Sequence, residues 1–220
     1  MLHKRRRIIV AALGVAAAAL LIGSFFFPYW EVVMHAPQYP QGLSISVYLN
    51  KVVGDVFEVN LLNHYIGMEK LQDAAGLERS LALYGLAFVG LCTIAFVFSG
   101  RKTMSLLAIP ALVFPLAFIV DLSMWLYRFG HNLDPRAPIT FTPFTPKMIG
   151  EGIIGQFSTM GSLGVGFYMA LLSFLLVIAA LILRFTVCNA CPFRERCSIT
   201  CSHLFFWPPP EYQERLAKRQ

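Results

Sequence analysis

The amino-acid sequence predicts an all-α polytopic membrane protein, in which four transmembrane helices carry a small mixed α/β outer cap formed by two long extracytoplasmic loops. Of the 220 residues, 57% are hydrophobic and only 14% are charged, whereas soluble domains carry about a quarter charged residues. The mean hydropathy is +0.63. Four apolar runs, at about residues 8–27, 80–99, 104–127 and 165–183, are long enough for the hydrocarbon core, which needs about 20 residues. Lipid is therefore the expected main solvent.

The four runs divide the chain into seven segments. These are a basic start with the first span (1–27), a first outer loop (28–79), the second span with a short turn (80–103), the third span (104–127), a second outer loop (128–164), the fourth span (165–183) and a cysteine-rich tail (184–220). No A-x-A cleavage site follows the first span, so we expect it to be retained as a signal anchor.

Positively charged residues are distributed unevenly between the two sides of this predicted protein. Twelve of the 18 Lys and Arg residues lie on the side that holds both termini, and the other six are spread over the two long loops. The positive-inside rule therefore predicts a multi-pass protein of a bacterial inner membrane, with both termini cytoplasmic and both loops outside. The net charge of +6 follows from this bias. Because the basic residues form no groove-reading motif, no nucleic-acid partner is indicated.

The first outer loop is predicted to fold as a small cap. Leu43–Leu49 alternates apolar and polar residues, which is typical of a half-buried strand, and Val56–Val59 is predicted to be a returning strand. A helix is predicted over Leu61–Met68. In such a helix His64 and Met68 share one face, and an imidazole beside a thioether suits Cu(I). The alternative is a hydrogen-bonded core histidine with Met68 packed against it.

The second outer loop adds polar residues on the same side of the membrane. His131 and Asp134 follow the third span directly, and His35 follows the first span. The candidate outer metal ligands are therefore His35, His64, Met68, His131 and Asp134, with copper as the expected metal. The proline-rich run from residue 135 to 146 is expected to be stiff and extended, suited to lying along a partner. Six glycines between residues 150 and 166 predict close packing of helices.

Asp121 is an acidic residue inside the third predicted span. A charged side chain in hydrocarbon costs a few kcal/mol unless it is paired or hydrated, so an intramembrane polar residue of this kind is a functional candidate. The alternative is that Asp121 bonds to a neighbouring helix or reaches headgroup water. Arg128, two helical turns further on, is a candidate partner.

Four cysteines cluster near the C-terminus with the spacing C-x2-C-x5-C-x3-C, at Cys188, Cys191, Cys197 and Cys201. The charge distribution places this tail in the cytoplasm, where thiols are kept reduced and disulfides are rare. Four thiolates so close together favour tetrahedral zinc or an iron–sulfur cluster. The alternative is a set of structural cysteines without a metal. The spacing does not decide between zinc and iron.

Several motifs resemble those of a known family. A-P-Q-Y-P-Q-G-L begins at Ala36, L-N-H-Y-I-G-M at Leu62, G-H-N-L-D-P-R-A-P at Gly130 and M-I-G at Met148. Together they resemble small four-span bacterial proteins of nitrous oxide reductase gene clusters, the NosB type and its relatives. The resemblance covers residues 28–162 and implies a role in maturing a periplasmic copper enzyme, or in supplying it with copper or electrons. It carries over no catalytic residues, and the cysteine tail lies outside it.

Three functions remain open from the sequence. The first is a membrane accessory factor that handles copper at its outer face for a periplasmic enzyme of the nitrous oxide reductase type. The second is a non-catalytic subunit or scaffold that docks a larger membrane or periplasmic partner. The third is an electron-transfer component with a metal-binding cysteine tail, although no His falls in any predicted span to ligate haem. No set of catalytic residues is recognised, so the sequence favours a role other than an enzyme.

Overall fold

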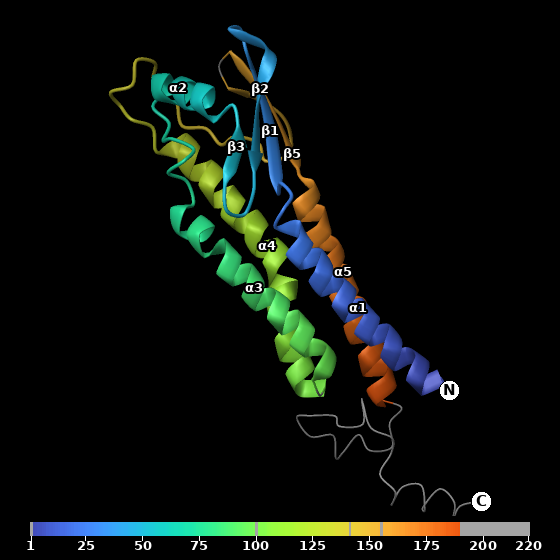
Figure 1. Ribbon diagram of the computed structural model, residues 1–220. Coiled ribbons are helices and arrows are strands. Elements are labelled where there is room, and N and C mark those ends of the chain that lie inside the picture. Colours follow the sequence, from blue (N-terminus) through green and yellow to red (C-terminus); the bar gives the residue numbers. More distant parts are fainter. Residues whose placement is uncertain (1, 100, 141, 155, 190–220) are drawn as a thin grey trace, which may run out of the picture.

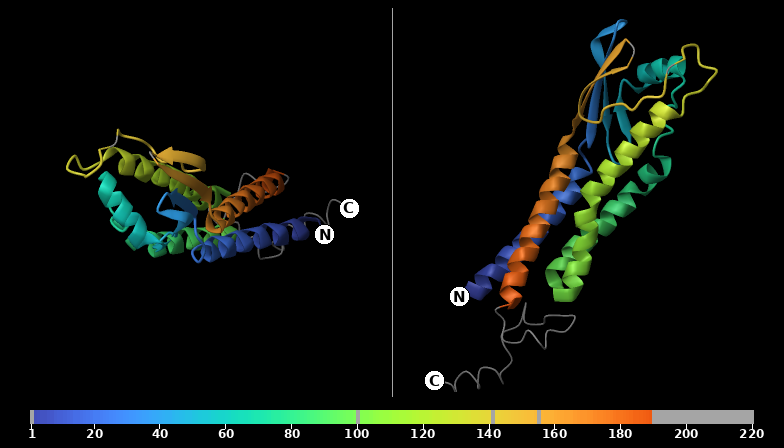
Figure 2. Two further views of the ribbon diagram at one scale, coloured as in Figure 1. Left: turned by 90° about the horizontal axis from the view of Figure 1, so that it is seen from above. Right: turned by 180° about the vertical axis from the view of Figure 1, so that it is seen from behind.

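In the computed structural model, which describes residues 2–99, 101–140, 142–154 and 156–189, four long helices lie side by side and a β-sheet caps one end of the bundle (Figure 1). The helices of the described residues are α1 (Leu2–Ser24), α2 (Val56–Ile66), α3 (Gly76–Phe98), α4 (Arg101–His131) and α5 (Val165–Asn189). The strands are β1 (Trp30–Ala36), β2 (Tyr39–Val47), β3 (Val52–Gly54), β4 (Gly150–Ile154) and β5 (Phe157–Leu163). Helix α2 lies at the same end of the bundle as the sheet, and the start of α1 lies at the opposite end (Figure 2).

The sheet joins the two predicted outer loops into one structure. Its strand order is β3-β2-β1-β5-β4, and every neighbouring pair is antiparallel. On the central strand β1, Trp30 pairs with Val47 of β2 on one side and with Leu163 of β5 on the other. Strand β1 of the first loop therefore pairs with β5, which comes more than a hundred residues later in the sequence.

The predicted fold class is wrong, because the chain is not all-α and because its described residues contain three helices, not four, that qualify as spans. The five-stranded sheet makes the fold mixed α/β. Within the described residues, three helices are long and apolar enough to cross a membrane: Gly76–Phe98, Thr103–His131 and Val165–Phe185. The described apolar part of α1, Ile8–Ser24, is shorter, because the predicted run also counted three phenylalanines that lie beyond the end of the helix. The chain is a multi-pass membrane protein in a lipid bilayer.

Helix α1 nevertheless belongs to the bundle. Ala17 and Leu21 are fully buried and share a core with Phe96 of α3 and Val177 of α5. The buried hydroxyl of Ser173 in α5 donates a hydrogen bond of 2.8 Å to the carbonyl oxygen of Ala17. These contacts fix α1 against α5. In the chain, α1 leads into β1, and β5 leads into α5.

Two further local predictions are wrong. The glycine-rich region after residue 150 forms β4 and β5 and not a helix contact. A Cβ on Gly161 would lie 2.5 Å from the carbonyl oxygen of Met148, so this glycine allows close approach of backbone to backbone. The expected strand at Val56–Val59 is instead the first turn of α2, which ends at Gly67 with a φ of 79°. That left-handed conformation favours glycine and explains where the helix stops.

Candidate functional site

Helices α3 and α4 enclose a large cavity. They lie close together near the short turn that joins them and separate toward the sheet (Figures 1 and 2). The space between them, covered by the sheet and α2, has a volume of about 690 Å³. We call it the interhelical cavity. Pockets of about 300–1,000 Å³ are typical of sites for small molecules and cofactors.

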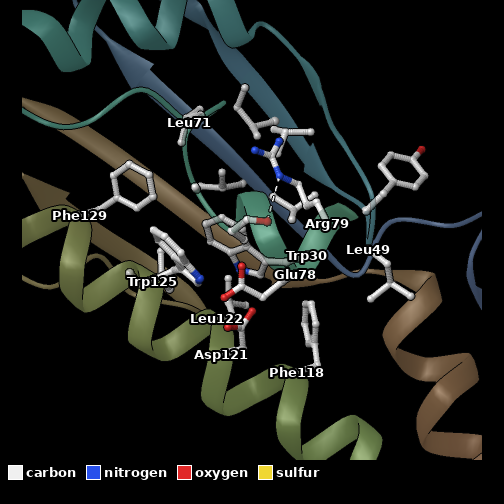
Figure 3. Close-up of a pocket in the computed structure, with 18 of the residues that line it drawn as sticks. Trp30, Leu49, Leu71, Glu78, Arg79, Phe118, Asp121, Leu122, Trp125 and Phe129 are labelled. Atoms are coloured by element: carbon white, nitrogen blue, oxygen red, sulfur yellow. Dashed lines mark hydrogen bonds between the residues drawn. The ribbon is translucent and has the colours of Figure 1, made fainter. Parts of the chain in front are cut away.

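The wall of the interhelical cavity is mostly apolar and rich in aromatic rings. Trp30 comes from β1, whereas Phe118, Trp125 and Phe129 come from α4 (Figure 3). Trp30 is held in place by its indole N–H, which donates a hydrogen bond of 2.7 Å to the carbonyl oxygen of Met148. Phe88 of α3 also lines the cavity and is 60% exposed. The apolar wall therefore continues onto the outer surface of a membrane helix.

Two carboxylates give the cavity a polar region. Asp121 lies in α4 and is half-buried, and Glu78 lies in the first turn of α3 and is exposed. Figure 3 shows the two carboxylate groups facing one another, and they are close enough to interact electrostatically. Two ionised carboxylates in an environment of low dielectric constant repel each other strongly unless a donor lies between them.

Trp125 adds an unsatisfied donor to the same region. Its indole nitrogen is directed toward the two carboxylates in Figure 3 and is near enough to Asp121 to interact with that group. The Nε1 atom is nevertheless buried and makes no hydrogen bond within normal geometric limits. Buried N–H groups nearly always have a partner in native structures. Arg128, the partner expected for Asp121, lies over the Trp125 ring with its Cζ 5.0 Å from the ring centroid.

The side chain of Arg79, a basic residue that lines the cavity, forms hydrogen bonds with the backbone. Its Nε donates a hydrogen bond of 3.4 Å to the carbonyl oxygen of Ala75, and its Nη2 donates to that of Gln72. The guanidinium group therefore holds the segment that leads into α3. Lys147, from the second outer loop, is the other basic residue that lines the cavity.

A second, polar pocket lies where the two outer loops meet. The backbone N–H of Asp134 donates a hydrogen bond of 2.8 Å to the carbonyl oxygen of Gly67, and the N–H of Ile139 donates one of 3.1 Å to that of Tyr65. The pocket beside this join has a volume of about 580 Å³. We call it the junction pocket; its lining residues are Gly67, Met68, Glu69, His131, Asn132, Leu133 and Asp134.

The junction pocket contains three of the five candidate outer metal ligands. Met68, His131 and Asp134 line it, whereas His64 and His35 do not. The His131 ring stacks on Tyr127 with centroids 3.8 Å apart, and its Nδ1 lies 2.9 Å from the carbonyl oxygen of Tyr127. Its Nε2 is therefore the ring nitrogen left for a metal.

The remaining two histidines lie apart from this pocket. His64 is exposed on α2, with its ring centroid 6.3 Å from that of Tyr65. His35 is exposed on β1, opposite Ser158 of β5. Among the residues that the structure describes, no three His, Cys, Asp or Glu side chains are grouped so that they could hold a metal ion.

The predicted metal site of the cysteine cluster lies outside the described residues. Cys191, Cys197 and Cys201 lie outside the described residues, and so does the side chain of Cys188, whose backbone belongs to the end of α5. Cys92, in α3, is buried and free.

Sequence reasoning identified Asp121 but missed its partner Glu78. The second span was predicted to begin at Ser80, which left Glu78 in the loop, although α3 begins at Gly76. An acidic residue one turn before an apolar run is the signal that could have found it. No family model matches the chain, and the search for similar curated proteins gave no match.

Proposed function

We propose that the protein binds a lipid-soluble, amphipathic molecule in the interhelical cavity. The observation that carries this proposal is a mostly apolar space of about 690 Å³ that contains two facing carboxylates and a buried indole N–H without a partner. An apolar pocket with a few convergent polar groups is the usual form of a small-molecule site. The protein acts in this proposal as a binding component of the membrane and not as an enzyme.

The position of the cavity supports entry from the membrane. Its walls include residues of α3 and α4, the two helices that follow each other across the bilayer. Phe88 and Leu81 line the cavity and are also 60% and 52% exposed on α3. In a bilayer such side chains contact acyl chains, so a lipid-soluble molecule has a continuous apolar route from lipid into the cavity.

The proposed orientation places the sheet and α2 outside a bacterial inner membrane and both chain ends in the cytoplasm. The support is the charge distribution: the basic cluster at residues 4–7 begins α1 at the end of the bundle opposite the sheet. The positive-inside rule assigns that end to the cytoplasm. Cysteine labelling from outside tests this: position 53 on β3 should react in intact spheroplasts, and position 4 should react only after lysis.

Tryptophan fluorescence provides a direct binding test. The chain has three tryptophans, and Trp30 and Trp125 line the cavity. In the Trp207→Phe variant, reconstituted in nanodiscs, a dibrominated fatty-acid methyl ester should quench fluorescence in a saturable way, because bromine quenches an indole on contact. Quenching that rises linearly with the ester and does not saturate would contradict a defined site.

A second candidate function is copper handling at the junction pocket for a periplasmic enzyme, as the family resemblance implies. The observation that favours it is that Met68, His131 and Asp134, from both outer loops, line one pocket. Thioether and imidazole ligands suit Cu(I). Anaerobic titration with Cu(I) should then show binding that His131→Ala removes and His64→Ala retains. If the two variants bind alike, the junction pocket is not the copper site.

The same candidate function includes a larger membrane or periplasmic protein as partner. The segment between His131 and β4 contains the proline-rich run and crosses the sheet end of the molecule (Figure 2). Purification from native membranes with and without a copper chelator tests for this partner: a scaffold keeps it in both cases, and a copper donor loses it with the metal.

A further inference from the structure

The polar groups of the interhelical cavity restrict the chemistry of its ligand, and this inference rests on the proposed function. Glu78 and Asp121 contribute carboxylate oxygens, which accept hydrogen bonds. The buried Nε1–H of Trp125 is directed toward them and makes no hydrogen bond within normal geometric limits. A ligand that forms hydrogen bonds with all of these groups must therefore donate a hydrogen bond to a carboxylate and accept one from the indole N–H.

The formal charges around the cavity favour a neutral ligand. Among its lining residues, Glu78 and Asp121 are acidic and Arg79 and Lys147 are basic, so their formal charges cancel. A ligand with a carboxylate or phosphate would lie against two carboxylates and be repelled. An ammonium group donates hydrogen bonds and cannot accept them, so a cationic ligand would itself offer the Trp125 N–H no acceptor.

We infer that the ligand is a neutral, lipid-soluble molecule whose polar end is a hydroxyl group. A hydroxyl both donates one hydrogen bond and accepts others, whereas an ester or quinone carbonyl only accepts. The hydroxyl donates to Asp121 or Glu78 and accepts from Trp125, and the apolar body packs against the rings of Trp30, Phe118 and Phe129.

The hydroxyl can be aliphatic, as in a long-chain alcohol, or phenolic, as in a hydroquinone with an alkyl tail. Aromatic rings prefer to pack against one another in edge-to-face or offset geometry. Because the cavity wall presents several rings, the phenolic form should bind more tightly than the aliphatic one. Competition by members of both classes distinguishes a phenolic from an aliphatic ligand.

The test is competition against the dibrominated ester in Trp207→Phe nanodiscs. The competitors are decylhydroquinone and its dimethyl ether, decanol and its methyl ether, and decyltrimethylammonium. Each hydroxyl compound should displace the ester at a concentration at least about tenfold lower than its own methyl ether, since a hydrogen bond to a charged group typically contributes that much or more. The ammonium compound should compete no better than the ethers.

Two variants test the assigned groups. Asp121→Leu combined with Glu78→Leu removes both acceptors and should abolish the difference between hydroxyl and ether. Neither change introduces a polar group, and saturable quenching by the ester in this variant shows that it is folded. Trp125→Phe should weaken the hydroxyl compounds about threefold or more and leave the ethers less affected, because a hydrogen bond is lost while the aromatic packing is kept. Val53→Leu, on the sheet surface and outside the cavity, is the matched control.

The outcomes separate this inference from the proposed function. If the ester binds saturably but ethers compete as well as alcohols, the hydroxyl inference is wrong and the apolar site stands. The inference also fails if the preference for hydroxyls persists in the double leucine variant, or if the ammonium compound competes best. If the ester itself shows no saturable binding, the proposed function fails.

Discussion

Replacing Gly85 with Phe should fill part of the interhelical cavity without disturbing the fold. Gly85 lies in α3 and lines the cavity, and a Cβ built on it has no heavy atom within 4 Å apart from its chain neighbours and the backbone of its own helix. A phenyl ring at this position therefore extends into open space. The side chain should compete directly with any molecule that occupies the cavity.

The effect of this substitution on the free energy of unfolding depends on helix propensity, because Gly85 lies inside α3. Glycine inside a helix is less favourable than alanine by about 0.5–1 kcal/mol, so Gly85→Ala should raise the free energy of unfolding by about this amount. Phenylalanine has a somewhat lower helix propensity than alanine. Gly85→Phe should therefore be at least as stable as the wild-type protein.

The assay combines chemical unfolding in one detergent with quenching by the dibrominated ester in nanodiscs. Gly85→Phe should weaken saturable quenching about tenfold or more, and Gly85→Ala should keep most of it. Leu83→Phe is the control, because Leu83 is 57% exposed on the same helix and does not line the cavity. Wild-type quenching in a well-folded Gly85→Phe protein would refute the site, and a loss of more than about 1 kcal/mol of stability would show that the space is not open.

Four further predictions test the surrounding structure. Gly67→Ala should lower the unfolding free energy by about 2–3 kcal/mol, because Gly67 has a φ of 79° and its Cβ would lie 2.9 Å from backbone atoms of Asp134. Gly76→Ala, whose Cβ would have nothing within 4 Å, should cost nothing. Equal effects of the two changes would contradict the close contact between the two outer loops at Gly67. Trp30→Phe should cost about 1–2 kcal/mol, because the carbonyl oxygen of Met148 loses its 2.7 Å hydrogen bond; an unchanged unfolding curve would show that this bond is unimportant. Asp121→Leu should raise the unfolding free energy by up to about 3 kcal/mol, since it removes a charge from a membrane helix; a destabilised variant would mean that Asp121 has a structural partner. Burial raises the pKa of Tyr29 to about 12, and the hydrogen bond with Ser24 opposes this rise with a smaller effect. Above pH 10 the phenol therefore ionises in the unfolded state but stays protonated in the folded state, so the unfolding free energy should fall by about 2–3 kcal/mol between pH 10 and 12. The Tyr29→Phe variant should lack this part of the loss.

The membrane helices could largely be predicted from the sequence, because composition and length decide them locally. The runs that became α3, α4 and α5 were located to within a few residues. The alternation that begins at Leu43 likewise marked the core of β2, where Leu43 and Ile45 are buried.

The sheet as a whole could not be predicted in this way. Gly150, Gly152 and Gly161 suggest close packing of helices in a membrane protein, and the same residues allow strands to approach other backbone segments. The pairing of β1 with β5 is non-local, so no short sequence window contains it. For the same reason, the first loop alone gave only a local strand and helix.

The candidate site depends on tertiary geometry that periodicity does not encode. Asp121 could be identified because a charge within an apolar run is conspicuous in the sequence. The residues that surround it in space could not be identified in this way. The cavity exists because α3 and α4 separate beneath the sheet, and this brings Glu78 and Trp30 to the same space as Asp121. Likewise, the i, i+4 spacing of His64 and Met68 suggested a shared site, yet only Met68 lines the junction pocket.

An experimental structure of the protein, extracted with its native lipids and without detergent, would show directly whether a molecule occupies the interhelical cavity. We expect elongated density between α3 and α4 beneath the sheet, with one end within hydrogen-bonding distance of Asp121 or Glu78. A structure in which the rings of Phe118 and Trp125 pack directly onto α3 and leave no room for a ligand would contradict this expectation.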